Sequence, residues 1–234
     1  MLRLIPRLHD ENPEPLVRAG LPPQLARVLW ARGVRTPEEA DAFLHPRVED
    51  LHDPLLLHGM EGAVQRIRNA LALGERIVVY GDYDVDGVSA SSILVEALRA
   101  NGADVGWYIP SRHKEGYGLN VDAVRALAKD TNLLITVDCG ITSVEEARPA
   151  DELGMDVIIT DHPEPPEVLP KVVAVIDHRL GEYPFRRRCG AGLAFKLFWA
   201  LVGQEAAEEL RELAALSNAA DLVPPYGVNR IIAP

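Results

Sequence analysis

The spacing of hydrophobic and polar positions becomes regular at about residue 60. The segment "MEGAVQRIRNALALGE", residues 60–75, has the apolar spacing of an amphipathic helix that ends at Gly74. The run "RIVVYG", residues 76–81, follows it and is short, apolar and rich in β-branched residues. Such a run predicts a buried strand, so a helix is followed here by a strand.

The alternation continues along the chain. Four more apolar runs predict strands at residues 104–110, 132–140, 156–162 and 171–178. Helical spacing is found at residues 88–103, 119–130, 142–155, 190–203 and 204–220, and Pro149 interrupts the third of these segments. Strands that alternate with helices predict right-handed βαβ units. We therefore expect an α/β fold with a mainly parallel five-stranded sheet flanked by helices.

The first part of the chain has a different pattern. Residues 22–34 and 36–44 predict short helices, and the second has a capping-box pattern with Thr36 as N-cap, Pro37 at the first position and Glu39 three residues after the cap. Residues 45–60 have the composition of a loop. We expect an N-terminal helical region and linker, residues 1–55, followed by the main domain, residues 56–234.

The composition restricts the class of protein but does not indicate a function. Hydrophobic residues make up 47% and charged residues 25% of the 234, as in soluble globular proteins. No apolar run approaches the roughly 20 residues that cross a bilayer. The segment "MLRLIPRLHDENPEP" does not resemble a signal peptide, and Cys139 and Cys189 fit a reducing compartment, so a cytoplasmic location is expected, with no membrane partner.

The net charge is −11, from 24 basic and 35 acidic residues. This balance argues against a generic basic clamp for nucleic acid. It does not exclude a nucleic-acid enzyme, because bound divalent cations would offset several negative charges at the site itself.

Acidic residues follow three of the predicted strands. Asp82, Asp84 and Asp86 come after the first strand, Asp138 after the third, and Asp161 with His162 after the fourth. The carboxyl ends of parallel strands meet at one edge of a sheet, where ligands of such folds bind. We therefore expect these side chains to lie close together.

An aspartate after a strand is often only a turn residue or a helix N-cap. One helix needs one cap, however, and the first strand alone is followed by three aspartates. Oxygen ligands with one imidazole suit Mn²⁺ or Mg²⁺, whereas Zn²⁺ more often recruits cysteine or further histidines. Two such ions that share a carboxylate can clamp a phosphoryl group and supply a hydroxide nucleophile. A nucleotide-binding Rossmann domain does not fit, because the first strand lacks the glycine-rich turn.

Several segments resemble the DHH phosphoesterase superfamily and, within it, the bacterial RecJ single-strand-specific exonucleases. They are "VVYGDYDVDG", "LLITVDCGI", "VIITDHPEP", "CGAGLAFKL" and "AALSNAADLVPPYGVNR", in the order found in that family. The resemblance implies 5′→3′ hydrolysis of single-stranded DNA in repair and recombination. It also implies two Mn²⁺ or Mg²⁺ ions, and a single-strand-binding protein and a helicase as partners.

The resemblance also implies roles for individual residues. The metal ligands would be Asp84, Asp86, Asp138 as the bridging ligand, His162 and Asp221, with Asp82 as a further catalytic acid. Tyr80 stands where many members carry a histidine ligand. For the substrate, we expect phosphate contacts from Arg112, His113 and Lys114, and from the backbone amides of Gly190 and Gly192.

Two departures from the family pattern leave alternatives open. The naming motif is Asp-His-His, but Pro163 stands in the place of the second histidine, and His178 and His113 are candidate substitutes. RecJ proteins also continue into C-terminal domains that we expect to be absent from this chain. The alternatives are a DHH phosphatase for pyrophosphate, short oligonucleotides or cyclic dinucleotides, and a DHH scaffold with weakened catalysis.

Overall fold

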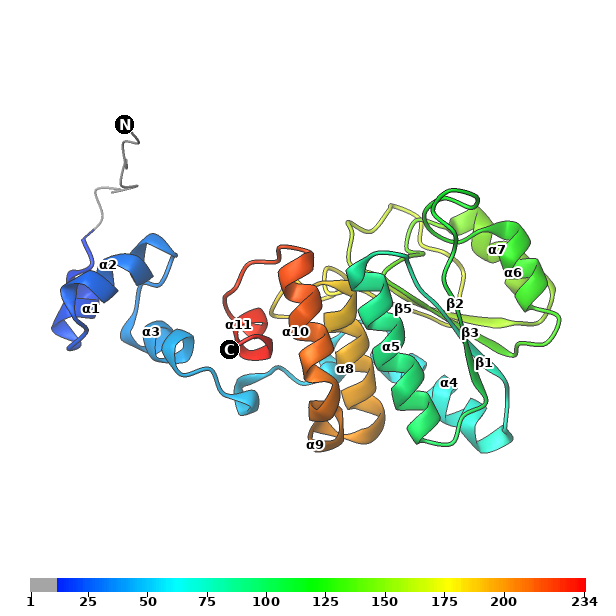
Figure 1. Ribbon diagram of the computed structural model, residues 1–234, viewed down its shortest axis with the longest axis horizontal. Coiled ribbons are helices and arrows are strands. Elements are labelled where there is room, and N and C mark those ends of the chain that lie inside the picture. The colour runs from blue at the N-terminus through cyan, green and yellow to red at the C-terminus, as the bar shows by residue number, and fades with distance from the viewer. Residues whose placement is uncertain (1–11) are drawn as a thin grey trace. The chain divides into compact units, whose positions relative to one another are not determined.

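The computed structural model describes residues 12–234 (Figure 1). These divide into two compact units, one that ends at Leu51 and a larger one of His52–Ala233. Most of the N-terminal segment in which we expect no signal peptide lies outside the described residues.

The smaller unit consists of short helices around a small apolar core. Its elements are α1 (Glu14–Arg18), α2 (Pro23–Ala31), α3 (Pro37–Leu44) and the 3₁₀ turn η1 (Val48–Asp50). The predicted capping box of α3 is confirmed, since the Glu39 amide donates to Thr36 Oγ1 (3.2 Å) and the Thr36 amide donates to Glu39 Oε2 (3.3 Å). The core contains Leu16, Ala26, Leu29, Val34 and Ala40.

The larger unit is built on a five-stranded sheet in which every pair of neighbours is parallel, so the predicted fold class is confirmed. The strand order is β2-β1-β3-β4-β5. The strands are β1 (Ile77–Tyr80), β2 (Val105–Tyr108), β3 (Leu133–Val137), β4 (Asp156–Thr160) and β5 (Ala174–Ile176). Strand β2 lies on one side of β1, and β3, β4 and β5 follow one another on the other side. The order therefore reverses between β1 and β3, where a crevice forms in folds of this kind.

Helices accompany the sheet (Figure 1). They are η2 (Pro54–Leu56), α4 (Met60–Leu73), α5 (Val85–Ala100), α6 (Val121–Leu127), α7 (Val144–Glu152), α8 (Gly190–Val202), α9 (Gln204–Ala207), η3 (Glu208–Leu210), α10 (Arg211–Ala220) and α11 (Val228–Ile232). Helices α5, α8 and α10 pack against one another, and α6 packs against α7. The core beneath α6 and α7 uses alternate residues of the strands, including Val78, Tyr80 and Leu134. Among the described residues, no helix is both long and apolar enough to cross a membrane.

Three helices differ from the prediction. Helix α5 begins at Val85 rather than at Val88, because Asp84 caps it and accepts a hydrogen bond from the Gly87 amide (2.9 Å). Helix α7 runs through Pro149 without interruption, and Pro149 is buried within it. The single helix expected over residues 204–220 is divided into α9, η3 and α10.

Candidate metal centre

The three aspartates after β1 occupy different positions around the start of α5. Asp82 lies in the turn and is buried, Asp84 is the N-cap, and Asp86 is buried in the first helical turn. Gly87 allows this close turn, because a Cβ at that position would lie 2.5 Å from the Asp82 carbonyl oxygen. The start of α5 thus folds back over Asp82 and directs several carboxylates to one edge of the sheet.

Asp138 comes directly after β3. Strand β3 is the neighbour of β1 at the switch point, which is the place where the strand order reverses. The backbone of Asp138 has a φ of 59°, in the left-handed region, and its side chain is buried. Aspartate tolerates this conformation better than most residues, yet it is strained there, and such strain is concentrated at functional sites.

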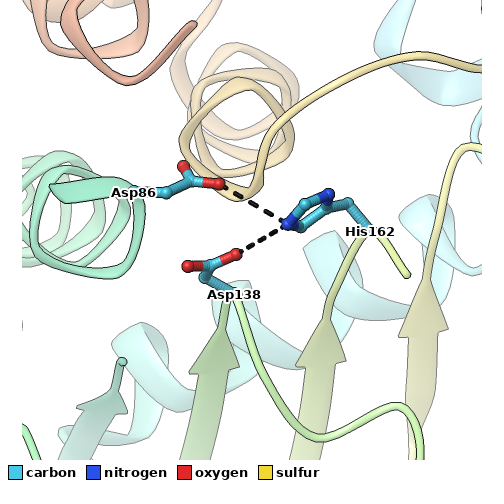
Figure 2. A group of neighbouring side chains, drawn as sticks. All are labelled: Asp86, Asp138 and His162. Atoms are coloured by element: carbon cyan, nitrogen blue, oxygen red, sulfur yellow. Dashed lines mark ion pairs between the residues drawn. The ribbon is translucent and has the colours of Figure 1, made fainter. Parts of the chain in front are cut away.

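His162 follows β4 and points toward two of the carboxylates (Figure 2). Its Nε2 atom lies 3.0 Å from Asp138 Oδ1 and 3.6 Å from Asp86 Oδ2. Asp161, just before it, is buried and accepts hydrogen bonds from the amides of Ile141 and His162 (2.9 Å each). Asp161 therefore orients the segment that carries the histidine.

Two groups of possible ligand atoms result, and they share one residue. Asp86, Asp138 and His162 each offer an atom within 4.8 Å of the others, and so do Asp82, Asp84 and Asp138. The second group includes a buried Asp82 oxygen, Oδ1, that has no hydrogen-bond partner among the described residues. Carboxylates with one imidazole suit Mn²⁺ or Mg²⁺. The residues therefore fit two divalent cations, with Asp138 between them.

The ionisation of the centre reflects the crowding of its acids. Burial raises the pKa of Asp138 to about 8, with the charges of Asp86 and Asp84 adding to the effect and the hydrogen bond from His162 opposing it. For His162, burial lowers the pKa, but the hydrogen bond to Asp138 and the neighbouring carboxylates outweigh it and raise the pKa to about 9. Burial also raises the pKa of Asp82. Cations in this position would favour the ionised carboxylates, against the burial and the neighbouring negative charges that raise the pKa values of Asp138 and Asp82.

The start of helix α8 binds one of the carboxylates, that of Asp86, through backbone amides. The amide of Gly190 donates to Asp86 Oδ2 (2.6 Å), and the amide of Ala191 donates to Asp86 Oδ1 (2.7 Å). A Cβ at Gly190 would lie 2.6 Å from Asp138 Oδ1, so a side chain there would collide with the centre. The Gly192 amide donates to Cys189 Sγ (3.3 Å). The two amides for which we expected phosphate contacts thus have partners inside the protein.

The remaining predicted residues lie farther from the two groups. Asp221 is the exposed C-cap of α10 and belongs to neither group, although its charge contributes to the raised pKa of His162. Arg112 lies over the Tyr83 ring (5.3 Å to its centroid), and its charge lowers the pKa of Asp82 against the larger effect of burial. His113 and Lys114 are exposed in the same loop.

Tyr117 is a residue of the site that the sequence analysis did not single out. Its hydroxyl donates to the Asp138 carbonyl oxygen (3.2 Å), while the residue is 57% exposed. Burial of its hydroxyl, followed by the charges of Asp161 and Asp138, raises its pKa, so the hydroxyl stays protonated. The only signal in the sequence is an aromatic residue between two glycines in "EGYG".

Two other residues named from the sequence lie apart from the ligand groups. The Tyr80 hydroxyl donates to the Gly118 carbonyl oxygen (3.0 Å), and its ring stacks on Tyr108 (5.1 Å between centroids), so it belongs to the core beneath α6. His178 is buried, and burial followed by the charges of Arg179 and Arg188 lowers its pKa to about 3. It is therefore a neutral imidazole at physiological pH.

Comparison with known proteins agrees with this geometry. Residues 76–223 match the N-terminal domain model of the DHH family. The chain belongs to the DHH family. It is 47% identical to the single-stranded-DNA-specific exonuclease RecJ of Bacillus subtilis over 90% of its own length and 27% of that protein's. It is 40% identical to RecJ of Thermus thermophilus, over 90% of this chain and 31% of the other.

Solved structures give the same picture. A crystal structure of exonuclease RecJ bound to manganese superposes with a TM-score of 0.73 at 40% identity, over 78% of this chain and 48% of the other. RecJ from Thermus thermophilus in complex with Mn²⁺ gives a TM-score of 0.77 at 35% identity, over 94% and 31%. This DHH chain thus spans less than half the length of these relatives.

Proposed function

We propose that this chain is the metal-binding catalytic part of a 5′→3′ exonuclease that hydrolyses phosphodiester bonds of single-stranded DNA in repair and recombination. The observation that carries the proposal is the pair of ligand groups that share Asp138 at the switch point of the sheet. Kinship with RecJ proteins supports the choice of substrate. By the same kinship we propose a cytoplasmic location, and a single-strand-binding protein and a helicase as partners.

The proposed roles follow from position. Asp82 and Asp84 would hold one ion, Asp86 and His162 the other, and Asp138 would contact both. Two ions so placed lower the pKa of an attacking water and offset charge on the phosphate. We propose that the substrate is contacted by Arg112, whose charge acts on Asp82, and by the ring of Tyr117, whose hydroxyl bonds the Asp138 carbonyl oxygen. We keep Asp221 as a proposed ligand, because its charge acts on His162.

Pro163 remains the main departure from the family motif. Proline has no N–H and no polar side chain, so it cannot replace the phosphate contact of a second histidine. Arg112 is the donor that we propose for this contact, because the single O–H of Tyr117 is already donated to the Asp138 carbonyl oxygen. His178 is less suited, because its ring is buried and the positive charges of Arg179 and Arg188 keep it neutral.

The test is Mn²⁺-dependent release of nucleotides from 5′-labelled single-stranded DNA. We expect activity on this substrate in preference to double-stranded DNA, pyrophosphate and cyclic di-AMP. Asp138→Asn keeps the shape of the side chain but removes the charge that both ions share, so activity should fall by at least about 100-fold. Asp122→Asn, at an exposed position of α6, is the matched control and should leave activity unchanged.

Other outcomes would redirect the proposal. Preferential turnover of pyrophosphate or a cyclic dinucleotide would assign the chain to the small-substrate phosphatases. Tight Mn²⁺ binding without hydrolysis of any of these substrates would favour a scaffold.

A further inference from the structure

Asp86 accepts three hydrogen bonds, and these come from two different helices. The amides of Gly190 and Ala191, at the start of α8, donate to Oδ2 and Oδ1 respectively. Ser217 of α10 donates its hydroxyl to Oδ1 (2.5 Å). Asp86 is 2% exposed and Ser217 is fully buried, so water does not compete for these contacts.

The hydrogen bonds divide unequally between the two oxygens. An ionised carboxylate has about four acceptor sites, two on each oxygen. Oδ1 accepts from both Ala191 and Ser217, which occupies both of its sites. Oδ2 accepts only from Gly190, and it is the oxygen that lies 3.6 Å from His162 Nε2. One acceptor site therefore remains for a cation, on Oδ2, facing the histidine.

The position of Ser217 is itself fixed by neighbouring contacts between α8 and α10. Cys189, the N-cap of α8, accepts from the Gly192 amide and donates to Asn218 Oδ1 (3.2 Å). The Asn218 side chain also donates to the Asn229 carbonyl oxygen (3.4 Å). These contacts join the start of α8 to the buried face of α10. The start of α8 and this part of α10 are thus held together, which places the Ser217 hydroxyl within hydrogen-bonding distance of Asp86 Oδ1.

We propose that Ser217 is a specificity-determining residue of the metal centre, and that it restricts Asp86 to ligation through one oxygen. The inference rests on the proposed metal-binding function of the same site. Ca²⁺ takes six to eight oxygen ligands, often from bidentate carboxylates, whereas Mg²⁺ requires a compact octahedral shell. Mn²⁺ accepts a shell of mixed oxygen and nitrogen ligands. A carboxylate confined to one oxygen therefore favours Mn²⁺ or Mg²⁺ over Ca²⁺ on the His162 side of the centre.

The test is calorimetric titration of the whole chain with Mn²⁺ and, separately, with Ca²⁺. Ser217→Ala frees an acceptor site on Oδ1, so Ca²⁺ should gain affinity relative to Mn²⁺ by about tenfold, within the range known for residues that support metal ligands. Ser217→Cys keeps a similar volume but replaces the hydroxyl by a weak donor, and it should shift the ratio in the same direction. Ser92→Ala, whose hydroxyl donates to the Val88 carbonyl oxygen on α5, is the matched control and should not change the ratio.

A crystal structure with Mn²⁺ provides a second measurement that does not depend on a variant. We expect the ion to contact Asp86 through Oδ2 alone, with the Ser217 hydrogen bond intact. Ligation through Oδ1 in the unaltered chain would overturn the inference, as would folded Ser217→Ala and Ser217→Cys variants with an unchanged ratio. If the unaltered chain binds no Mn²⁺, both the proposed metal-binding function and the proposed role of Ser217 are wrong. Metal binding without nuclease activity would contradict the proposed nuclease activity but not the proposed role of Ser217.

Discussion

Several ionisable side chains of this protein lie where water is excluded. Asp86 and Asp138 are buried at the metal centre, and Lys196 is fully buried on α8. The Nζ atom of Lys196 donates to the His52 carbonyl oxygen and lies 3.7 Å from the centroid of the Trp199 ring. Burial, followed by the charge of Arg188, lowers its pKa to about 6. At neutral pH, therefore, Lys196 is largely uncharged.

The pKa of Lys196 predicts how stability depends on pH. In the unfolded chain the residue should titrate near 10.5, so between pH 6 and pH 10.5 the unfolded state binds a proton that the folded state does not. The contribution of Lys196 to the free energy of unfolding should therefore rise with pH across this window, by up to about 1.4 kcal/mol per pH unit. Lys196→Met removes this contribution, so its stability relative to the unaltered chain should be greatest near pH 6 and decline toward pH 10.

Urea denaturation at several pH values measures this difference. The exposed Lys129 gives the control, and Lys129→Met should leave the slope unchanged. A slope that is the same in Lys196→Met and the unaltered chain would mean that Lys196 remains charged in the fold.

At the scale of elements, the centre depends on the approach of α8 to the strand ends. The first residue of α8, Gly190, bonds Asp86 through its amide, and its α-carbon faces the Asp138 carboxylate. The absence of a side chain allows both contacts. Glycine is needed here for space, since its backbone is not in the left-handed region.

Gly190→Ala tests this close approach. The added Cβ would lie 2.6 Å from Asp138 Oδ1, so either α8 or Asp138 must move. We expect Mn²⁺ affinity to fall by about 10- to 100-fold and the free energy of unfolding by about 1–3 kcal/mol. Gly62→Ala on α4 is the control: a Cβ there meets nothing within 4 Å, and replacing a helical glycine should raise stability by up to about 1 kcal/mol. Unchanged Mn²⁺ affinity in Gly190→Ala would show that the contact is not needed.

For the molecule as a whole, the net charge of −11 opposes the binding of DNA. The carboxylates of the centre add to this repulsion where a phosphate would have to bind. Divalent cations would reverse the local sign, although the total charge would remain negative. Binding of DNA should therefore depend on the metal and not only on the exposed arginines.

Removal of metal tests this dependence. We expect the affinity for a non-hydrolysable phosphorothioate oligonucleotide, measured by fluorescence anisotropy, to fall by at least about tenfold when EDTA replaces Mn²⁺ at constant ionic strength. Arg112→Gln should weaken binding in the presence of Mn²⁺, whereas Arg148→Gln, on the exposed side of α7, should not. Equal affinity with and without Mn²⁺ would place the DNA-binding surface elsewhere on the chain.

Most of the elements, and the edge of the sheet at which the acids meet, follow from the amino-acid sequence alone. Local signals are sufficient for this: Thr36 and Glu39 form their capping box within one turn, Gly74 ends α4, and β1 is a continuous apolar run. Because all the strands are parallel, residues that follow them reach the same edge whatever the details of packing. The grouping of Asp82, Asp84, Asp86, Asp138 and His162 could therefore be expected before any coordinates.

The surroundings of these acids depend on how the helices pack. Ser217 is separated from Asp86 by 131 positions and the Gly190 amide by 104, and no local pattern relates residues so far apart. The glycines of α8 resembled a phosphate-binding turn, but their amides are taken by Asp86 and Cys189 once α8 packs against α5. The physical reason is that local propensity acts over a few residues, whereas buried donors and acceptors are matched wherever packing brings them together.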